Sequence, residues 1–176
     1  DRELLRQHLA QESGQARLSW WIRLLDAEQD MRVVAEAASA DEAYACLVAG
    51  GVDLAVVDLN LKGGSGIEAI RRMLAREPGL RVLVISMHDN PSFVTQAMRA
   101  GALGYLTKNS EPEEMLTGLR EVAAGRRVLS EDVARAVAAA ALEGDAPLAR
   151  LTPREFDVLR LAARGNPPER LHAACI

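Results

Sequence analysis

Short aliphatic runs alternate with helical patterns from Met31 to Gly125, and this alternation constrains the fold more than any other feature. The aliphatic runs predict strands over residues 32–37, 52–58, 81–86 and 102–107. The two middle runs are nearly continuously apolar, which is typical of parallel strands covered on both faces. Strands that alternate with helices are joined by right-handed crossovers. The pattern therefore predicts an α/β fold with a parallel, doubly wound sheet.

Cap signals indicate where the intervening helices begin. Three serines stand three residues before a glutamate, the spacing of a capping box, namely Ser39, Ser65 and Ser110. A fourth helix is predicted to begin at Asn90 and Pro91 and to end at Gly101. Further along, Ser130 is predicted to cap an alanine-rich helix that runs to about Leu142.

Three of the predicted strands end at polar residues, which are Asp58, Ser86 and, just past its strand, Lys108. In an open parallel sheet, ligands bind beyond the carboxyl ends of the strands. A carboxylate there can act as a nucleophile toward a phosphoryl group. An ammonium group can neutralise the phosphoryl oxygens, and a hydroxyl can donate a hydrogen bond to one of them. The glycine-bearing loop over residues 61–66 leaves the approach to Asp58 open.

Each of these residues also has a plainer interpretation. Taken singly, Asp58 fits a turn or helix cap, Ser86 a strand-end hydroxyl and Lys108 a solvated surface lysine. Tyr105 stands three residues before Lys108, where its ring could move between buried and exposed positions, or could be an ordinary core aromatic. The phosphate-handling interpretation depends on the three strand ends occurring together.

Three segments resemble NarL/FixJ-type response regulators, in order and at matching separations: 56–61 with 63–69, 84–89, and 100–108. The resemblance covers about residues 21–130 and implies a flavodoxin-like receiver domain. It implies that Asp58 is the phosphoacceptor, that Ser86 and Tyr105 form a switch pair, and that Lys108 and Ser86 contact the phosphate. It also implies a magnesium ion bound by Asp58 and the main-chain carbonyl of Asn60. His88 follows the switch strand and is expected to be a surface residue.

Residues 151–165 resemble the first helix of a LuxR-type helix-turn-helix. The expected division is a receiver over 1–127, a linker helix and linker over 128–149, and a partial helix-turn-helix over 150–176. A DNA reader needs a recognition helix whose side chains reach base edges. The residues after Gly165 are too few and too rich in proline to form one, so DNA is an expected partner only if the motif were complete.

Residues 1–20 depart from the receiver pattern, because receivers begin with an aliphatic strand that ends in an acidic pair. Residues 1–14 instead pattern as a helix, and ungapped extension places Glu12 and Ser13 where that pair belongs. Glu12 is thus a weak candidate magnesium ligand, or a solvated helix residue. A divalent cation held by few carboxylates binds weakly.

The same departure affects folding, because the first strand of a receiver lies at the centre of the sheet. Three explanations are open: the first residues form an unorthodox strand, another chain fills the position, or the sequence is altered there. The atypical first residues and the incomplete helix-turn-helix would both be explained if the chain were a truncated or frame-altered copy of a longer regulator.

Composition narrows the classes of function. The 21 basic and 25 acidic residues give a net charge of −4, which argues against binding of nucleic acid through overall charge. Two cysteines, Cys46 and Cys175, fit a reducing cytosol, and no apolar run is long enough to cross a bilayer. A cytoplasmic protein without a membrane partner is therefore expected.

Two functions remain open. The first is a two-component response regulator that accepts a phosphoryl group from a sensor histidine kinase, forms a homodimer and controls transcription. The second is a phosphorylation-independent module for protein interaction or dimerisation. A classical enzyme is not expected, because the chain has no dinucleotide-binding fingerprint, no Walker-type loop and no nucleophile–base pair.

Overall fold

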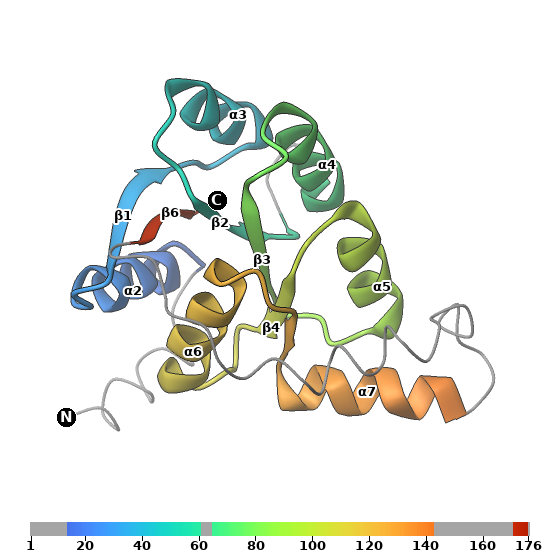
Figure 1. Cartoon of the computed structure of the whole chain (residues 1–176). Coiled ribbons are helices and arrows are strands. Elements are labelled where there is room, and N and C mark those ends of the chain that lie inside the picture. The colour runs from blue at the N-terminus through green and yellow to red at the C-terminus, as the bar shows by residue number, and fades with distance from the viewer. Residues whose placement is uncertain (1–13, 61–64, 143–170, 176) are drawn as a thin grey trace.

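The computed structural model describes the backbone of residues 14–60, 65–142 and 171–175, and the side chains from Trp20 onward within the first two ranges. The elements, labelled in Figure 1, follow in chain order: α2 (Gly14–Asp26), β1 (Met31–Glu36), α3 (Ala40–Ala49), β2 (Leu54–Asp58), α4 (Gly66–Arg76), β3 (Arg81–Ser86), α5 (Pro91–Ala100), β4 (Gly104–Thr107), α6 (Pro112–Ala123), β5 (Val128–Leu129), α7 (Glu131–Leu142) and β6 (Leu171–Cys175).

The strands form one six-stranded sheet in the order β1-β6-β2-β3-β4-β5, and every neighbouring pair is parallel. Helices α3, α4, α5 and α7 lie on one side of the sheet, whereas α2 and α6 lie on the other (Figure 1). The predicted α/β class and the doubly wound arrangement are confirmed. The four predicted strands begin and end within two residues of their expected limits.

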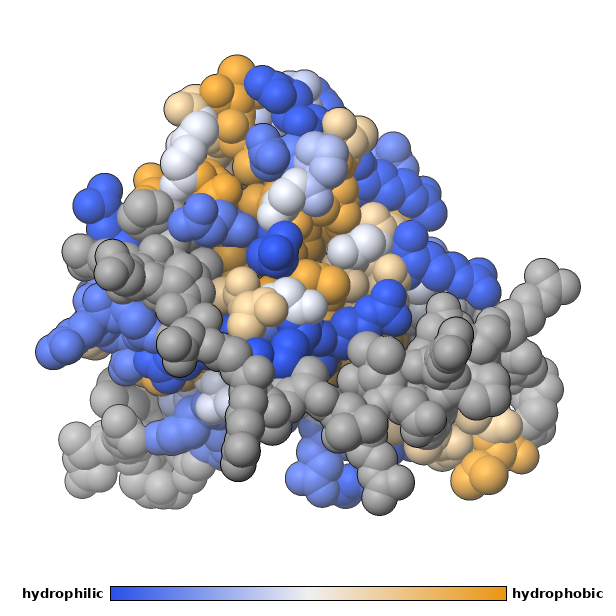
Figure 2. Space-filling model, viewed as in Figure 1, coloured by the Kyte–Doolittle hydropathy of each residue, from blue (hydrophilic) through white to orange (hydrophobic). Residues whose placement is uncertain are grey.

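Alternate strand residues supply two hydrophobic cores, one on each face of the sheet. In β2, Ala55 and Val57 face the side covered by α3, α4, α5 and α7, whereas Leu54 and Val56 face α2 and α6. All four side chains are buried, which explains the continuous apolar run of this strand. Apolar atoms show in the middle of the molecule, between the polar residues of the surrounding helices (Figure 2).

The predicted helix starts were correct in part. Ser39 caps α3 by accepting a hydrogen bond from the Glu42 amide, and Asn90 and Gly101 bound α5 as expected. The capping boxes at the two other serines were wrong. Ser65 is the N-cap residue of α4 but its side chain makes no capping hydrogen bond, and α6 has Glu111 as its N-cap rather than Ser110. Pro112 explains the later start, because proline is favoured in the first turn of a helix.

Strand β6 is the main difference from the sequence prediction. Leu171–Cys175 lie between β1 and β2, in an interior position next to the edge strand β1, and in a range assigned to the partial helix-turn-helix. A segment of the same chain thus fills the position expected for a first strand, and this was not among the three explanations considered. The rest of the predicted helix-turn-helix, with residues 1–13 and 143–149, lies outside the described residues.

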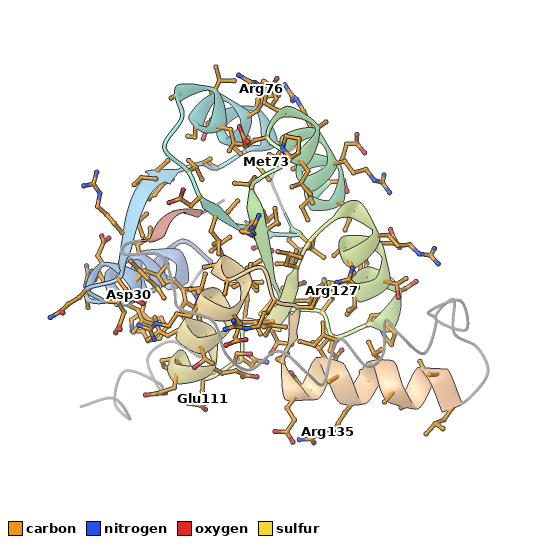
Figure 3. The ribbon with its side chains drawn as sticks, in the orientation of Figure 1. Asp30, Met73, Arg76, Glu111, Arg127 and Arg135 are labelled. Carbon is orange, nitrogen blue, oxygen red and sulfur yellow. The ribbon has the colours of Figure 1, made fainter. Side chains whose placement is uncertain are left out.

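A group of ion pairs joins α6 to the loop before β1. The Arg120 guanidinium donates to both carboxylate oxygens of Asp30, at 2.8 and 2.9 Å, and to Glu28 at 2.7 Å. Asp30 lies beside α2, whereas Arg135 points from the outer surface of α7 into solvent (Figure 3). None of the helices in the described ranges is long and apolar enough to cross a membrane.

Candidate functional site

Asp58 is the last residue of β2, and its position follows from the burial of that strand. The four preceding residues are buried, so the chain leaves the core at Asp58, whose side chain is 26% exposed. The Asn60 amide donates to Asp58 Oδ1 at 3.0 Å. This hydrogen bond fixes one carboxylate oxygen and leaves the carboxylate half-buried at the carboxyl edge of the sheet.

Lys108 reaches Asp58 from just past the end of β4. Its ammonium Nζ forms an ion pair and hydrogen bond with Asp58 Oδ2. The Lys108 amide donates to the Ser86 carbonyl at 2.8 Å, which ties the residue to the end of β3. The predicted convergence of Asp58 and Lys108 at one edge is therefore present in the structure.

Ser86 ends β3, the strand between those that carry Asp58 and Lys108. Its side chain is fully buried, and its Oγ accepts a hydrogen bond from the His88 amide at 3.1 Å. The Ser86 hydroxyl can also donate one hydrogen bond, and it lies within hydrogen-bond reach of the Tyr105 side chain. Asp58 is the register partner of Ile85, so Ser86 lies one residue further along the neighbouring strand.

Tyr105 points into the protein and has no exposed surface. Its hydroxyl donates to the His88 carbonyl at 2.7 Å. Burial raises the pKa of the Tyr105 phenol above its usual value. The main chain of His88 thus joins the two residues of the predicted switch pair, because its amide binds Ser86 and its carbonyl binds Tyr105.

Sequence reasoning missed this role of His88, which was expected only as a surface residue. Main-chain hydrogen bonds leave no trace in residue type, so no signal in the sequence could have indicated them. The His88 ring stacks on Phe93 with ring centroids 5.4 Å apart.

Gly66 has a steric role beyond the one predicted for the loop over residues 61–66, which was to leave the approach to Asp58 open. A Cβ at this position would lie 2.7 Å from the Leu59 Cα and 2.8 Å from the Asp58 carbonyl oxygen. Only glycine lets α4 begin this close to the backbone that carries Asp58. The neighbouring loop residues 61–64 lie outside the described residues.

A second missed contact joins the site's strand to α7. The buried Thr107 donates from Oγ1 to Asp132 Oδ2 at 2.9 Å. Val133, the next residue of α7, is fully buried in the same hydrophobic core as Tyr105. The linker helix is therefore packed on the face of the sheet that contains the predicted switch tyrosine.

Within the described residues, the set of magnesium ligands is incomplete. Asp58 supplies one carboxylate beside the main chain of Asn60, and no group of three or more His, Cys, Asp or Glu residues able to hold a metal occurs in the described part of the chain. Glu12, the third predicted ligand, lies outside that part. Magnesium prefers octahedral coordination by oxygen. The described residues alone do not make such a site.

Comparison with known proteins gives the family. The family model of the response regulator receiver domain matches residues 12–120, a range that contains Asp58, Ser86, Tyr105 and Lys108. The chain belongs to this family. The predicted resemblance to response regulators is thereby confirmed, and the flavodoxin-like doubly wound sheet is the receiver fold.

Two curated relatives extend the match beyond the receiver. NarL, the nitrate/nitrite response regulator of Escherichia coli K12, is 35% identical over 149 residues, which are 82% of this chain and 69% of that protein. The transcriptional regulatory protein UhpA of Salmonella typhimurium LT2 is 35% identical over 162 residues, 92% of this chain and 75% of that protein. By name, the first of these relatives is a response regulator and the second is a transcriptional regulatory protein; neither is a classical enzyme.

Two solved structures share the fold. A LuxR-family two-component response regulator from Aurantimonas sp. SI85-9A1 is 38% identical with a TM-score of 0.68, covering 70% of this chain and 89% of that chain. A response regulator from Burkholderia pseudomallei, solved with a phosphorylated aspartic acid, a calcium ion and citrate, is 25% identical with a TM-score of 0.56, covering 74% of this chain and 69% of that chain.

Proposed function

We propose that Asp58 of this receiver is the phosphoacceptor of a two-component system. The observation that carries the proposal is the ion pair between Lys108 Nζ and a half-buried Asp58 carboxylate at the carboxyl edge of the sheet. A related response regulator contains a phosphorylated aspartic acid, which supports an aspartate as the acceptor. The alternative, a phosphorylation-independent module, gains no support from the comparisons.

In the proposed reaction, an Asp58 carboxylate oxygen attacks phosphorus in-line, and the bond from phosphorus to the donor's leaving atom breaks. For a sensor kinase that bond is a histidine N–P bond, and the imidazole leaves with the electron pair. Oδ1 already accepts a hydrogen bond from Asn60, whereas Oδ2 is paired with Lys108. The Lys108 ammonium group would then pair with an oxygen of the transferred phosphoryl group instead of with the carboxylate.

Ser86 is proposed to bind a phosphoryl oxygen by donating its hydroxyl hydrogen, in place of its interaction with the Tyr105 side chain. Its Oγ is held by the His88 amide, and His88 in turn holds the Tyr105 hydroxyl. A shift of Ser86 toward the phosphoryl group would pull on the His88 main chain, whose carbonyl binds the Tyr105 hydroxyl. Phosphorylation of Asp58 could in this way change the position of Tyr105, which lies on the face of the sheet covered by α5 and α7. A two-state rearrangement of that face would alter the interactions of the receiver with its partners.

Magnesium is proposed as the cofactor, as in receiver domains generally. It would supply positive charge near the transferred phosphoryl group. Asp58 and the Asn60 carbonyl are the proposed ligands among the described residues, and Glu12 stays a prediction. Weak binding of magnesium is expected, because few of the described residues offer oxygen ligands for it.

The proposed partners are a sensor histidine kinase and a second copy of the chain. Binding to DNA is proposed only for a form that carries a complete helix-turn-helix, as the transcriptional relatives suggest. The cytoplasmic location and the domain limits at residues 127 and 149 stay predictions. Any catalysis is predicted to go no further than self-phosphorylation and autodephosphorylation.

Incubation of the full chain with acetyl phosphate and magnesium tests the proposal. Intact-mass spectrometry should show the gain of one phosphoryl group by the native chain and none by Asp58→Asn, which keeps the size of the side chain. Asp53→Asn is the matched control and should still gain the group. An equal mass gain in native chain and Asp58→Asn, or no gain in either, would contradict the proposal.

A further inference from the structure

The start of α7 is tied to β4, the strand that ends at Thr107. The Thr107 hydroxyl donates to Asp132 Oδ2 at 2.9 Å, and the Ser130 amide donates to the Tyr105 carbonyl at 3.1 Å. Val133 is fully buried in the same hydrophobic core as Tyr105. A side-chain hydrogen bond, a main-chain hydrogen bond and buried apolar surface thus join β4 to the first turn of α7, so we expect the two to move together.

Thr107 is placed to control the position of Lys108, the residue that follows it. Thr107 is the last residue of β4 and is only 4% exposed. A buried hydroxyl needs a hydrogen-bond partner, and Asp132 supplies one. The Lys108 amide is held in turn by the Ser86 carbonyl at 2.8 Å. These two contacts fix the direction in which the chain leaves the strand, and with it the point from which the Lys108 side chain extends toward Asp58.

Asp132 also has a plainer interpretation, because acidic residues in the first turn stabilise a helix through its dipole. Two acidic residues stand in the first turn of α7, namely Glu131 and Asp132. Glu131 forms an ion pair with Arg135, which lies on the outer surface of α7 (Figure 3). Either carboxylate can serve the helix dipole, whereas it is Asp132 that accepts the hydrogen bond from Thr107.

We propose that Asp132 is a positioning residue for phosphoryl transfer to Asp58. By holding the Thr107 hydroxyl, Asp132 keeps the end of β4 in the position from which Lys108 pairs with the acceptor carboxylate. The inference rests on the proposed function of Asp58 and adds a dependence of that site on α7. By thermodynamic linkage, a phosphoryl group that draws Lys108 away from the carboxylate also changes how tightly the first turn of α7 binds β4.

Variants of Thr107 separate positioning from packing. Thr107→Val replaces the hydroxyl by a methyl group of similar size, whereas Thr107→Ser keeps the hydroxyl. With acetyl phosphate and magnesium, Thr107→Val and Asp132→Ala should each gain the phosphoryl group about fivefold more slowly than the native chain, because small displacements of a reacting group are costly in rate. Thr107→Ser should recover most of the native rate. The double variant should be no slower than either single variant, since both changes remove the same hydrogen bond.

Glu131→Ala is the matched control for Asp132→Ala. It removes the neighbouring carboxylate of the same helix turn, whose side chain is 81% exposed and paired with Arg135 rather than with β4. It should therefore react at the native rate. Intact-mass spectrometry over time measures the rates, and circular dichroism checks that each variant is folded.

A second measurement follows Lys108 without any phosphoryl donor. Lys62 and Lys108 are the two lysines of the sequence, so lysine labelled with ¹³C at Cε gives two NMR signals, and Lys108→Met identifies the signal of Lys108. This signal should shift in Thr107→Val and Asp132→Ala, because the ammonium group is displaced from its place beside the acceptor carboxylate. It should keep its native position in Glu131→Ala. The result does not depend on whether the chain accepts a phosphoryl group.

Three results would overturn the proposal. Native rates in Thr107→Val and Asp132→Ala, or an unshifted Lys108 signal in both, would show that the contact does not position the site. Equal slowing by Glu131→Ala and Asp132→Ala would assign the effect to the helix dipole. Failure of Thr107→Ser to recover the rate would assign it to packing. If the native chain gains no phosphoryl group, the proposed function of the site fails, and the Lys108 signal alone decides whether Asp132 positions that lysine.

Discussion

At the scale of single residues, the sequence predicted the placement of Asp58 and Lys108 because both stand at the ends of apolar strands. Parallel strands bring their carboxyl ends to one edge, so strand order alone places these side chains near each other. The roles of Glu12, Ser86 and Asn60 stay predictions. Contacts that pass through the main chain, such as those of His88, depend on local geometry that residue type does not encode.

Gly66→Ala should destabilise the chain by about 1–3 kcal/mol, the usual cost of inserting a methyl group into close-packed structure. The added Cβ meets backbone atoms of Leu59 and Asp58, which cannot move aside as a flexible side chain can. Urea unfolding followed by circular dichroism measures the change. Gly79→Ala is the control, because its Cβ would come no closer than 3.5 Å to Glu77 Oε1. Equal stability of the two variants would contradict the steric role of Gly66.

Tyr105→Phe should cost about 1 kcal/mol at neutral pH, because the His88 carbonyl loses its hydrogen bond. The pKa of Tyr105 is raised on folding by burial, so its contribution is complete below the unfolded pKa of about 10 and is lost as pH rises above that value. The native chain should therefore lose more stability between about pH 8 and pH 11 than the variant does. Urea unfolding at both pH values tests this, with Tyr44→Phe as a control that keeps the alkaline loss. Parallel curves for the native chain and Tyr105→Phe would contradict it.

At the scale of elements, the sequence predicted strands more closely than helix starts. Buried strands require apolar residues at every position, and this requirement is visible in the sequence. A serine followed by glutamate is a weaker signal, since Pro112 displaced one predicted start and Ser65 makes no capping bond. The packing of α7 through Thr107 and Asp132 joins segments whose contact the sequence could not indicate.

Arg120→Met should lower the free energy of unfolding by about 1 kcal/mol at neutral pH, because its ion pairs are about one-third exposed. The hydrogen bond from Arg120 lowers the pKa of Asp30, so this contribution is present above the unfolded pKa of Asp30 and is lost as pH falls through the folded value. The difference between native chain and variant should shrink from about pH 5 downward in thermal unfolding.

The Glu68–Arg71 pair provides the control for this prediction, because its side chains are 71% and 58% exposed. Arg71→Met should change stability by less than about 0.5 kcal/mol at any pH. An effect as large as that of Arg120→Met would mean that overall charge, rather than the link between α6 and the β1 loop, determines the result.

At the scale of the whole molecule, the receiver fold was predictable and the closure of its sheet was not. The alternating pattern between residues 31 and 125 specifies four strands and the helices between them. The interior strand between β1 and β2 comes instead from residues 171–175, whose small, mixed residue types carry no strand signal. The position of β6 therefore depends on the unpaired edges of β1 and β2 rather than on the residue types of β6.

The central claim is that the carboxylate paired with Lys108 is the one that receives the phosphoryl group. Borohydride reduction of the chain after acetyl phosphate treatment converts an aspartyl phosphate to homoserine, which peptide sequencing by mass spectrometry can locate. The account predicts homoserine at position 58, with its yield reduced in Lys108→Met. Homoserine at another position, such as Asp53 or Asp89, with Asp58 intact, would contradict it.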